Sequence, residues 1–159
     1  YDEAQKAALA AEKNQRYQTF IQSLTSADIL PGISALLKNA EQHGLKLAIA
    51  SASKNASLIL RRLGLFAQFD AIVDPQSLHH GKPDPEIYRA AQKLLKLHAD
   101  EVISFADAPV GIAAIKAAGQ FAVGIGEASA LAAADYLVSN TAQLDYDQIV
   151  AAFERYHAR

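Results

Sequence analysis

Apolar positions along this chain recur at two different spacings, which predict helices and strands in alternation. In residues 2–24 they recur every three or four positions among good helix formers, which predicts one amphipathic helix. Beyond it, short apolar runs have the length of buried strands, and the segments between them have helical spacing. The expected strands are 45–50, 71–73, 101–105, 121–125 and 136–138. The expected further helices are 33–43, 55–63, 84–98, 109–118, 129–134 and 145–156.

This alternation predicts an α/β fold in which a parallel sheet is flanked by helices. Residues 25–31 break the first helical pattern and end in a Pro, followed by Gly32, so we expect a domain junction there. We divide the chain into residues 1–26 and an α/β core of residues 27–159. Because ligands bind at the carboxyl edge of parallel sheets, the residues that follow each strand are the candidates for chemistry.

Composition and charge narrow the classes of partner. Hydrophobic residues make up 51% of the chain and charged residues 20%, as in folded globular proteins. The net charge of −2 offers no excess of Lys and Arg to nucleic acid or to anionic lipid. The chain has no Cys, which excludes disulfides, thiolate nucleophiles and Cys metal sites. With no apolar run of membrane-spanning length and no signal-peptide pattern, we predict a cytoplasmic protein without a membrane partner.

The first residues are unusual for the start of a reading frame. The chain contains no Met, and Tyr1-Asp2-Glu3 reads as the middle of a helix. We therefore expect a chain truncated at its N-terminus, with a Met-poor sequence and a trimmed start as the alternative.

The segment Ser51-Ala52-Ser53-Lys54-Asn55 follows the first expected core strand and leads into a helix. Small residues let the backbone approach an anion, and free amides together with the helix dipole favour negative charge. The two Ser hydroxyls add hydrogen-bond donors, and Lys54 adds a cation. The pattern predicts a phosphate cradle, while a helix cap formed by Ser and Asn55 stays open as the alternative.

Two further candidates follow the next two strands. Lys82 lies between a Gly and a Pro, and a Lys held at a strand edge can neutralise a phosphoryl group. Asp107 suits Mg²⁺, which prefers carboxylate and phosphate oxygens. Each residue alone also has a plainer interpretation, as a solvated loop Lys and as a helix N-cap. With the Ser51–Asn55 segment they predict a site for phosphate and Mg²⁺, whereas His79 and His80 lack a third ligand nearby and are assigned no metal.

These three motifs, in this order, resemble those of the haloacid dehalogenase superfamily. The matching runs are Leu47–Asn55, Lys82–Pro85 and Phe105–Ile112. Within the superfamily, the Ser-Ala-Ser-Lys-Asn run, residues 66–72 and residues 26–33 are similar to the β-phosphoglucomutase-like subfamily. The resemblance covers essentially the whole chain. It implies a Rossmann-like parallel sheet, with residues 1–26 as the last helix of a helical cap.

The resemblance also implies roles for the matching residues. Ser51, with the amide of Ala52, would hold the transferring phosphoryl group, and Lys82 would balance its charge. Asp107 would help to hold Mg²⁺. The non-transferring phosphate of a hexose phosphate would be bound by Ser53, Lys54 and Asn55. Lys13 and Asn14 would face this small-molecule substrate across the cleft, with a solvated helix face as the alternative.

Two departures from the family pattern concern the chemistry. The family's nucleophile lies in an Asp-x-Asp-Gly segment at the end of the central strand, and this chain has no such segment. Asp-x-Asp occurs only as Asp145-Tyr146-Asp147, which no buried strand precedes, so we assign it no catalytic role. The acidic residue that usually precedes the Asp of the third motif is Ala106 here, which removes one Mg²⁺ ligand.

Without the central strand, two internal sheet edges carry unpaired amides and carbonyls, which is costly. We therefore expect a further N-terminal segment, a rearranged chain or a partner that donates a strand. The complete protein is predicted to interconvert β-glucose 1-phosphate and glucose 6-phosphate through an aspartyl-phosphate. The 159 residues alone are predicted to be inactive, since no residue is placed to form the phosphoenzyme. A sugar-phosphate phosphatase and an inactive relative that only binds phosphorylated ligands are the alternatives.

Overall fold

The strands of this chain are divided between two parallel sheets. The computed structural model describes residues 2–158, except for the side chains of residues 9–14. In the first sheet, β1 (Ala48–Ile49) pairs with β2 (Ala71–Ile72). In the second, the order is β3 (Ile103–Ala106), β4 (Phe121–Ile125) and β5 (Tyr136–Val138). All these pairs are parallel, which confirms the predicted α/β class.

Within the described residues, β1 pairs only with β2, and β3 pairs only with β4. One edge of β1 and one edge of β3 therefore have no strand beside them. The same holds for one edge of β2 and one edge of β5, so each sheet has two free edges among the described residues.

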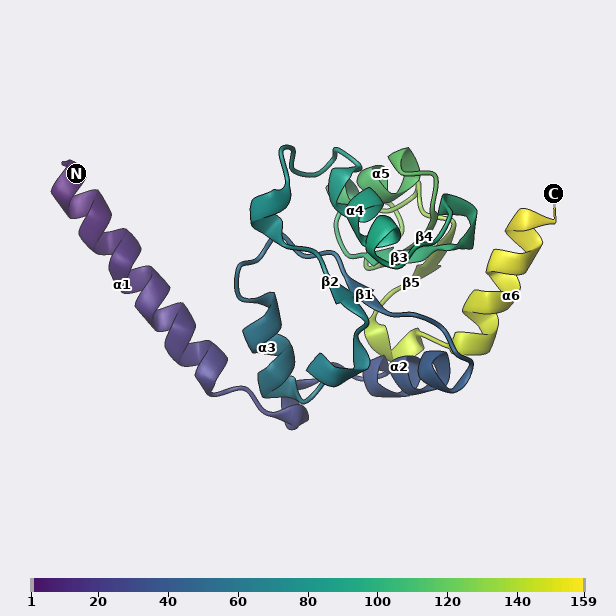
Figure 1. The fold of residues 1–159 in the computed structure, drawn as a ribbon, viewed down its shortest axis with the longest axis horizontal. Helices are drawn as coiled ribbons and strands as arrows, with labels where there is room; N and C mark the ends of the chain where they lie inside the picture. The colour runs from purple at the N-terminus through teal and green to yellow at the C-terminus, as the bar shows by residue number, and fades with distance from the viewer. Residues whose placement is uncertain (1, 159) are drawn as a thin grey trace.

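Helices cover the sheets and extend the molecule at both ends of the chain (Figure 1). The helices are α1 (Glu3–Gln22), α2 (Ile33–Gln42), α3 (Ala56–Leu63), α4 (Glu86–Leu94), α5 (Pro109–Ala117) and α6 (Tyr146–His157). Short 3₁₀ helices are η1 (Ser26–Asp28), η2 (Phe66–Gln68), η3 (Pro75–Ser77), η4 (Ala99–Glu101) and η5 (Thr141–Gln143). α1 projects away from the α/β body, and its C-terminal part contacts α3. None of the helices in residues 2–158 has the length and hydropathy that a bilayer span requires.

Successive residues of β4 enter two different hydrophobic clusters. Ala122 belongs to a buried cluster with Ile112 of α5, which α4 also joins. Phe121 and Val123 belong to a second cluster with Ile149 of α6, against which α2 packs. Since side chains alternate between the faces of a strand, β4 is buried on both. The second sheet therefore has α4 and α5 on one face and α2 and α6 on the other.

Some predicted elements are shorter in the structure than in the sequence pattern. The predicted strand 45–50 pairs only over Ala48–Ile49. The predicted helix 84–98 ends at Leu94, and Lys96 takes a φ of 58°, which a helix does not contain.

The predicted helix 129–134 is wrong, because residues 128–133 form turns. The amides of Ala130 and Leu131 both donate to the Glu127 carbonyl, so the chain turns within one short segment. Six residues are too few to offset the cost of helix nucleation without strong packing. The turn instead places the Leu131 side chain in the core, where it is 2% exposed.

Candidate functional site

The loop between β1 and α3 presents several hydrogen-bond donors. The backbone N–H of Ser53 donates to Ser51 Oγ, and that of Asn55 donates to Ser53 Oγ, each over 3.1 Å. Because each hydroxyl oxygen already accepts a bond, its own proton is left to donate elsewhere. The backbone amides of Ala52 and Lys54 donate to no group that the structure describes. Two hydroxyls and two amides are therefore available to an oxyanion.

Asn55 occupies the N-cap position of α3 but does not cap it. Its side chain makes no hydrogen bond to the first amides of the helix. Its Oδ1 instead accepts a bond of 2.9 Å from Gln18 Nε2 of α1. The predicted N-cap position of Asn55 is confirmed, but its side chain makes no capping hydrogen bond. Gln18 is a contact that sequence reasoning missed, since the two residues are 37 positions apart and a Gln on a polar helix gives no local signal.

Lys82 and Asp107 line the same small cavity. It has a volume of about 190 Å³ and lies where β1 and β3 end. Its other lining residues are Ala50, Tyr88, Phe105, Ala106, Ala108, Val110 and Gly111. Ala50 immediately precedes Ser51, so the segments that carry all three sequence motifs border this cavity.

Asp107 follows the last residue of β3, and its side chain is exposed. The N-cap residue of α5 is Ala108, and no side chain caps that helix. The N-cap interpretation of Asp107 is therefore wrong, because the helix begins at Pro109, one residue too late for it. The carboxylate instead faces the cavity that it shares with Lys82.

Tyr88, which the sequence analysis did not single out, packs against Lys82. The Lys82 Nζ lies 5.2 Å from the centroid of the Tyr88 ring, within the range of a cation–π contact. Burial, and to a smaller degree the negative charge of Asp107, raises the pKa of Tyr88 above its usual value of 10.0. The available signal was a Tyr on the apolar face of the helix that follows Lys82.

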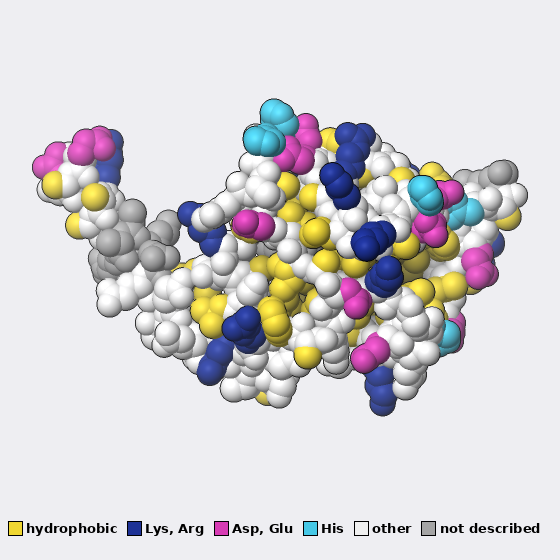
Figure 2. Space-filling view, in the orientation of Figure 1, with side chains coloured by type: hydrophobic (Ala, Val, Ile, Leu, Met, Phe, Trp, Pro, Cys, Tyr) yellow, Lys and Arg dark blue, Asp and Glu magenta, His cyan; other side chains and the backbone are white. Residues whose placement is uncertain are grey.

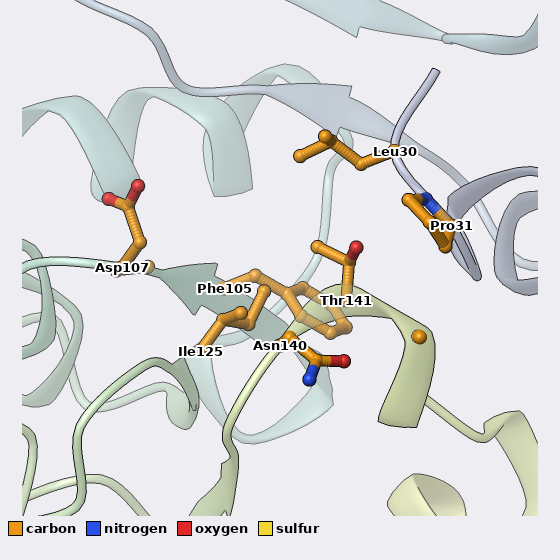
Figure 3. Close-up of a pocket in the computed structure, with 9 residues that line it drawn as sticks. Leu30, Pro31, Phe105, Asp107, Ile125, Asn140 and Thr141 are labelled. Atoms are coloured by element: carbon orange, nitrogen blue, oxygen red, sulfur yellow. The ribbon is translucent and has the colours of Figure 1, made fainter. Parts of the chain in front are cut away.

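A second, larger cavity lies beside the C-terminal ends of β3 and β4 and the segment that follows β5. Its volume is about 750 Å³, and it also reaches Asp107. Figure 3 shows Leu30 and Pro31 on one side, with Phe105, Ile125 and Thr141 on the other. Its walls are thus mainly apolar, and Phe105 is 37% exposed there.

The described residues offer one carboxylate for Mg²⁺ at this place. Among residues 2–158, no three His, Asp or Glu side chains gather closely enough to form a metal site. Mg²⁺ usually keeps several waters and takes one or two carboxylates together with substrate phosphates. Asp107, in the cavity that Ala50 also lines, fits such an ion, while Ala106 and Ala108 on either side contribute no oxygen from their side chains.

His79, His80 and Asp145, which the sequence analysis weighs as candidates for chemistry, have structural roles. The amides of His79 and His80 both donate to the Glu86 carboxylate, which orders the loop before α4. Asp145 caps α6 by accepting from the Gln148 amide over 2.9 Å, so the Asp-x-Asp pattern there begins a helix.

The predicted substrate contacts of Lys13 and Asn14 fall in α1, at positions whose side chains are outside the described set. On the face drawn in Figure 2, basic side chains are interspersed with acidic and hydrophobic ones, and hydrophobic side chains line a hollow near the centre of the view.

Comparison with known proteins finds relatives along the whole chain. Residues 1–119 match the family described as "Hydrolase: haloacid dehalogenase-like hydrolase". The β-phosphoglucomutase of Bacillus subtilis is 42% identical over 159 residues, which are 100% of this chain and 70% of that protein. The validoxylamine A 7'-phosphate phosphatase of Streptomyces hygroscopicus subsp. limoneus is 32% identical over 131 residues, covering 79% of this chain and 62% of that protein.

A solved structure agrees with these sequence matches. The crystal structure of β-phosphoglucomutase from Clostridium difficile superposes with a TM-score of 0.93 at 38% sequence identity. The match covers 100% of this chain and 71% of that one. The chain therefore spans between 62% and 71% of the length of these three proteins.

Proposed function

The chain belongs to the haloacid dehalogenase-like hydrolase family, and from this premise we propose that the complete protein transfers a phosphoryl group on a hexose phosphate. One observation carries the proposal. Lys82 and Asp107 line a single cavity together with Ala50, the residue that immediately precedes the Ser51–Asn55 loop. A cation, a carboxylate and a set of oriented donors are what phosphoryl transfer needs, because it depends on positioning and on charge neutralisation. The proposed reaction interconverts β-glucose 1-phosphate and glucose 6-phosphate.

The proposed roles follow from the donors and charges around the cavity. Ser51 and the Ala52 amide donate to the transferring phosphoryl group, whose charge the Lys82 ammonium balances. The Tyr88 ring keeps that ammonium beside the cavity. The phosphate that is not transferred is held by Ser53, Lys54 and Asn55.

Asp107 is the residue that would hold Mg²⁺. The ion, when bound, neutralises part of the phosphoryl charge. In the same proposal, residues 1–26 belong to a cap and residues 27–159 to the catalytic core. Lys13 and Asn14 then contact the sugar phosphate from the cap side.

We propose that an extended strand that carries the aspartate nucleophile inserts beside β1 and β3, next to the 750 Å³ cavity. An inserted strand would pair with the free edges of β1 and β3 and would cover the exposed side of Phe105. It would also end near Asp107, which lines both cavities. Such a strand comes from a segment outside these 159 residues or from a partner. The nucleophile on it forms the aspartyl-phosphate.

A sugar-phosphate phosphatase is the second candidate. The observation that favours it is the similarity to a validoxylamine A 7'-phosphate phosphatase over 79% of this chain. In a mutase the phosphoryl group passes to a second sugar oxygen, and in a phosphatase it passes to water. A third outcome, binding of phosphorylated ligands without turnover, follows if no strand supplies the nucleophile.

The test supplies β-glucose 1-phosphate, glucose 1,6-bisphosphate and Mg²⁺ to protein whose intact mass has been measured. Phosphorus NMR then follows glucose 6-phosphate and inorganic phosphate in the same sample. Glucose 6-phosphate without inorganic phosphate indicates a mutase, and release of inorganic phosphate indicates a phosphatase. Protein whose mass equals that of the 159 residues is expected to bind phosphate but to form neither glucose 6-phosphate nor inorganic phosphate. Turnover by that material would contradict the proposed origin of the nucleophile.

Matched variants test the proposed residues in protein that is active. Lys82→Met is expected to lower kcat/KM by about 10²-fold to 10³-fold, as loss of a group that stabilises transition-state charge does. Lys93→Met removes an exposed Lys from α4 and is expected to leave kcat/KM unchanged. Equal losses in the two variants would show that Lys82 has no special role.

A further inference from the structure

A hydrogen bond joins α1 to the phosphate loop and has no part in the roles described so far. Gln18 Nε2 donates to Asn55 Oδ1 over 2.9 Å, and the bond is partly buried. A carboxamide has one oxygen that accepts and one NH₂ group that donates. With its oxygen held by Gln18, Asn55 keeps its NH₂ group for another acceptor.

The backbone of Asn55 is held as well. Its N–H donates to Ser53 Oγ, while its side chain takes no part in capping α3. The residue is therefore fixed at two points, through its backbone by the loop and through its side chain by α1. Without the hydrogen bond from Gln18, the Asn55 carboxamide can rotate and present its oxygen to the loop, and an anion is repelled by that oxygen.

A second contact keeps Gln18 in place. The Arg62 guanidinium in the last turn of α3 donates to the backbone carbonyl of Gln22. Gln18 and Gln22 are four residues apart, so they lie on the same face of α1, one turn from each other. Asn55 precedes α3 and Arg62 lies near its end, so α1 is attached at both ends of that helix.

We propose that Gln18 is a positioning residue for anion binding, which orients the Asn55 carboxamide so that its NH₂ group donates to a phosphate at the Ser51–Asn55 loop. This inference rests on the proposed function, which assigns phosphate binding to that loop. Gln18 itself does not touch the anion in this arrangement. Its effect on affinity therefore passes entirely through Asn55.

A double-mutant cycle on phosphate affinity tests this. The full 159-residue chain is titrated with inorganic phosphate by calorimetry, as wild type, Gln18→Leu, Asn55→Ala and the double variant. Each single variant is expected to weaken binding about tenfold to a hundredfold, the effect of losing one hydrogen bond to a charged group. The double variant is expected to be no weaker than Asn55→Ala, because Gln18 has nothing left to orient. Gln15→Leu, an exposed position on the same helix, is the control and should stay within about twofold of wild type.

Each other outcome overturns a different statement. If Asn55→Ala weakens binding and Gln18→Leu does not, the positioning role is wrong and the phosphate loop stands. If the two losses add in the double variant, Gln18 acts independently of Asn55 and the proposal is also wrong. If wild type does not bind phosphate at all, the phosphate loop of the proposed function is wrong, and this inference fails with it. The NMR resonances of the Asn55 NH₂ group are expected to shift in Gln18→Leu even without phosphate, which reports the hydrogen bond separately.

Discussion

Gln120 Nε2 donates to the backbone carbonyl of Tyr88 over 3.0 Å. Gln120 is buried, with only 1% of its surface exposed. The same NH₂ group donates to Gln92 Oε1, and the Gln120 oxygen accepts from the Ser104 hydroxyl. One buried carboxamide thus connects α4, which carries Tyr88, to β3, which leads to Asp107. Tyr88 and Asp107 both line the smaller cavity.

Replacing Gln120 by Ala is expected to destabilise the fold strongly. The change leaves the Tyr88 carbonyl and the Ser104 hydroxyl without their partner and opens a void, which together cost about 2–4 kcal/mol. Urea unfolding measures the loss of unfolding free energy. Gln76→Ala, at an exposed position, is the control and should change that free energy by less than about 0.5 kcal/mol. Similar losses in the two variants would contradict a structural role for the buried network.

The ring of Tyr88 is expected to matter more than its hydroxyl for phosphate binding. Tyr88→Phe keeps an aromatic face for the Lys82 ammonium, whereas Tyr88→Leu removes it. Affinity for inorganic phosphate, measured by calorimetry, should fall about threefold to tenfold more in the Leu variant than in the Phe variant, as loss of a cation–π contact allows. Equal affinities in the two variants would show that the ring does not hold Lys82.

Stability is expected to fall as the pH rises above about 10, in part because of Tyr88. Burial first, and then the charge of Asp107, raises the pKa of Tyr88 in the folded protein above 10.0. In that range the folded state holds a proton that the unfolded state has lost, so the free energy of unfolding decreases with pH. Below pH 10 both states are protonated, and Tyr88 adds no pH dependence.

Comparison of wild type with Tyr88→Phe isolates this contribution. Burial lowers the pKa of Lys116, but the hydrogen bonds and charges of Asp135 and Tyr156 together raise it by more, so Lys116 adds a fall of the same sign. That part is common to both proteins and cancels in the difference. Urea unfolding at pH 8 and pH 11 should show the smaller fall in Tyr88→Phe. An equal fall would contradict a raised pKa at Tyr88.

A Cβ atom at Gly111 is expected to disturb the contact between α5 and β3. It would lie 2.7 Å from the Cβ of Ala106, which belongs to a strand and cannot swing aside. Gly111→Ala should lower the free energy of unfolding by about 1–3 kcal/mol, as overpacking of a core does. Gly81→Ala is the control, because a Cβ there meets nothing within 4 Å. Thermal unfolding of both variants measures the difference. An unchanged stability of Gly111→Ala would show that α5 and β3 can move apart at little cost.

Mg²⁺ is expected to strengthen phosphate binding through Asp107. Calorimetric titration with inorganic phosphate should give a tighter affinity with Mg²⁺ than with EDTA in wild type, because a carboxylate and a phosphate can share the ion. Asp107→Asn should lose most of this difference. Asp100→Asn, at an exposed position in η4, should keep it. Retention of the Mg²⁺ effect in Asp107→Asn would place the ion elsewhere.

Apart from the predicted helix 129–134, periodicity and local motifs were sufficient for the order of the elements. The alternation of apolar runs predicts the parallel α/β class, and the positions after each strand predict Lys82 and Asp107 as neighbours in one cavity. Such predictions succeed because side-chain spacing follows from backbone geometry, and because parallel strands end at a common edge.

Contacts between distant segments were decided only by the tertiary structure. Asn55 stands where a helix cap belongs, yet its oxygen is held by Gln18 of α1. Gln120 donates to the Tyr88 carbonyl, 32 positions away, and no local pattern in the sequence indicates that contact. Local sequence limits the conformations that each segment adopts, but hydrogen bonds and ring contacts between segments depend on how the whole chain packs.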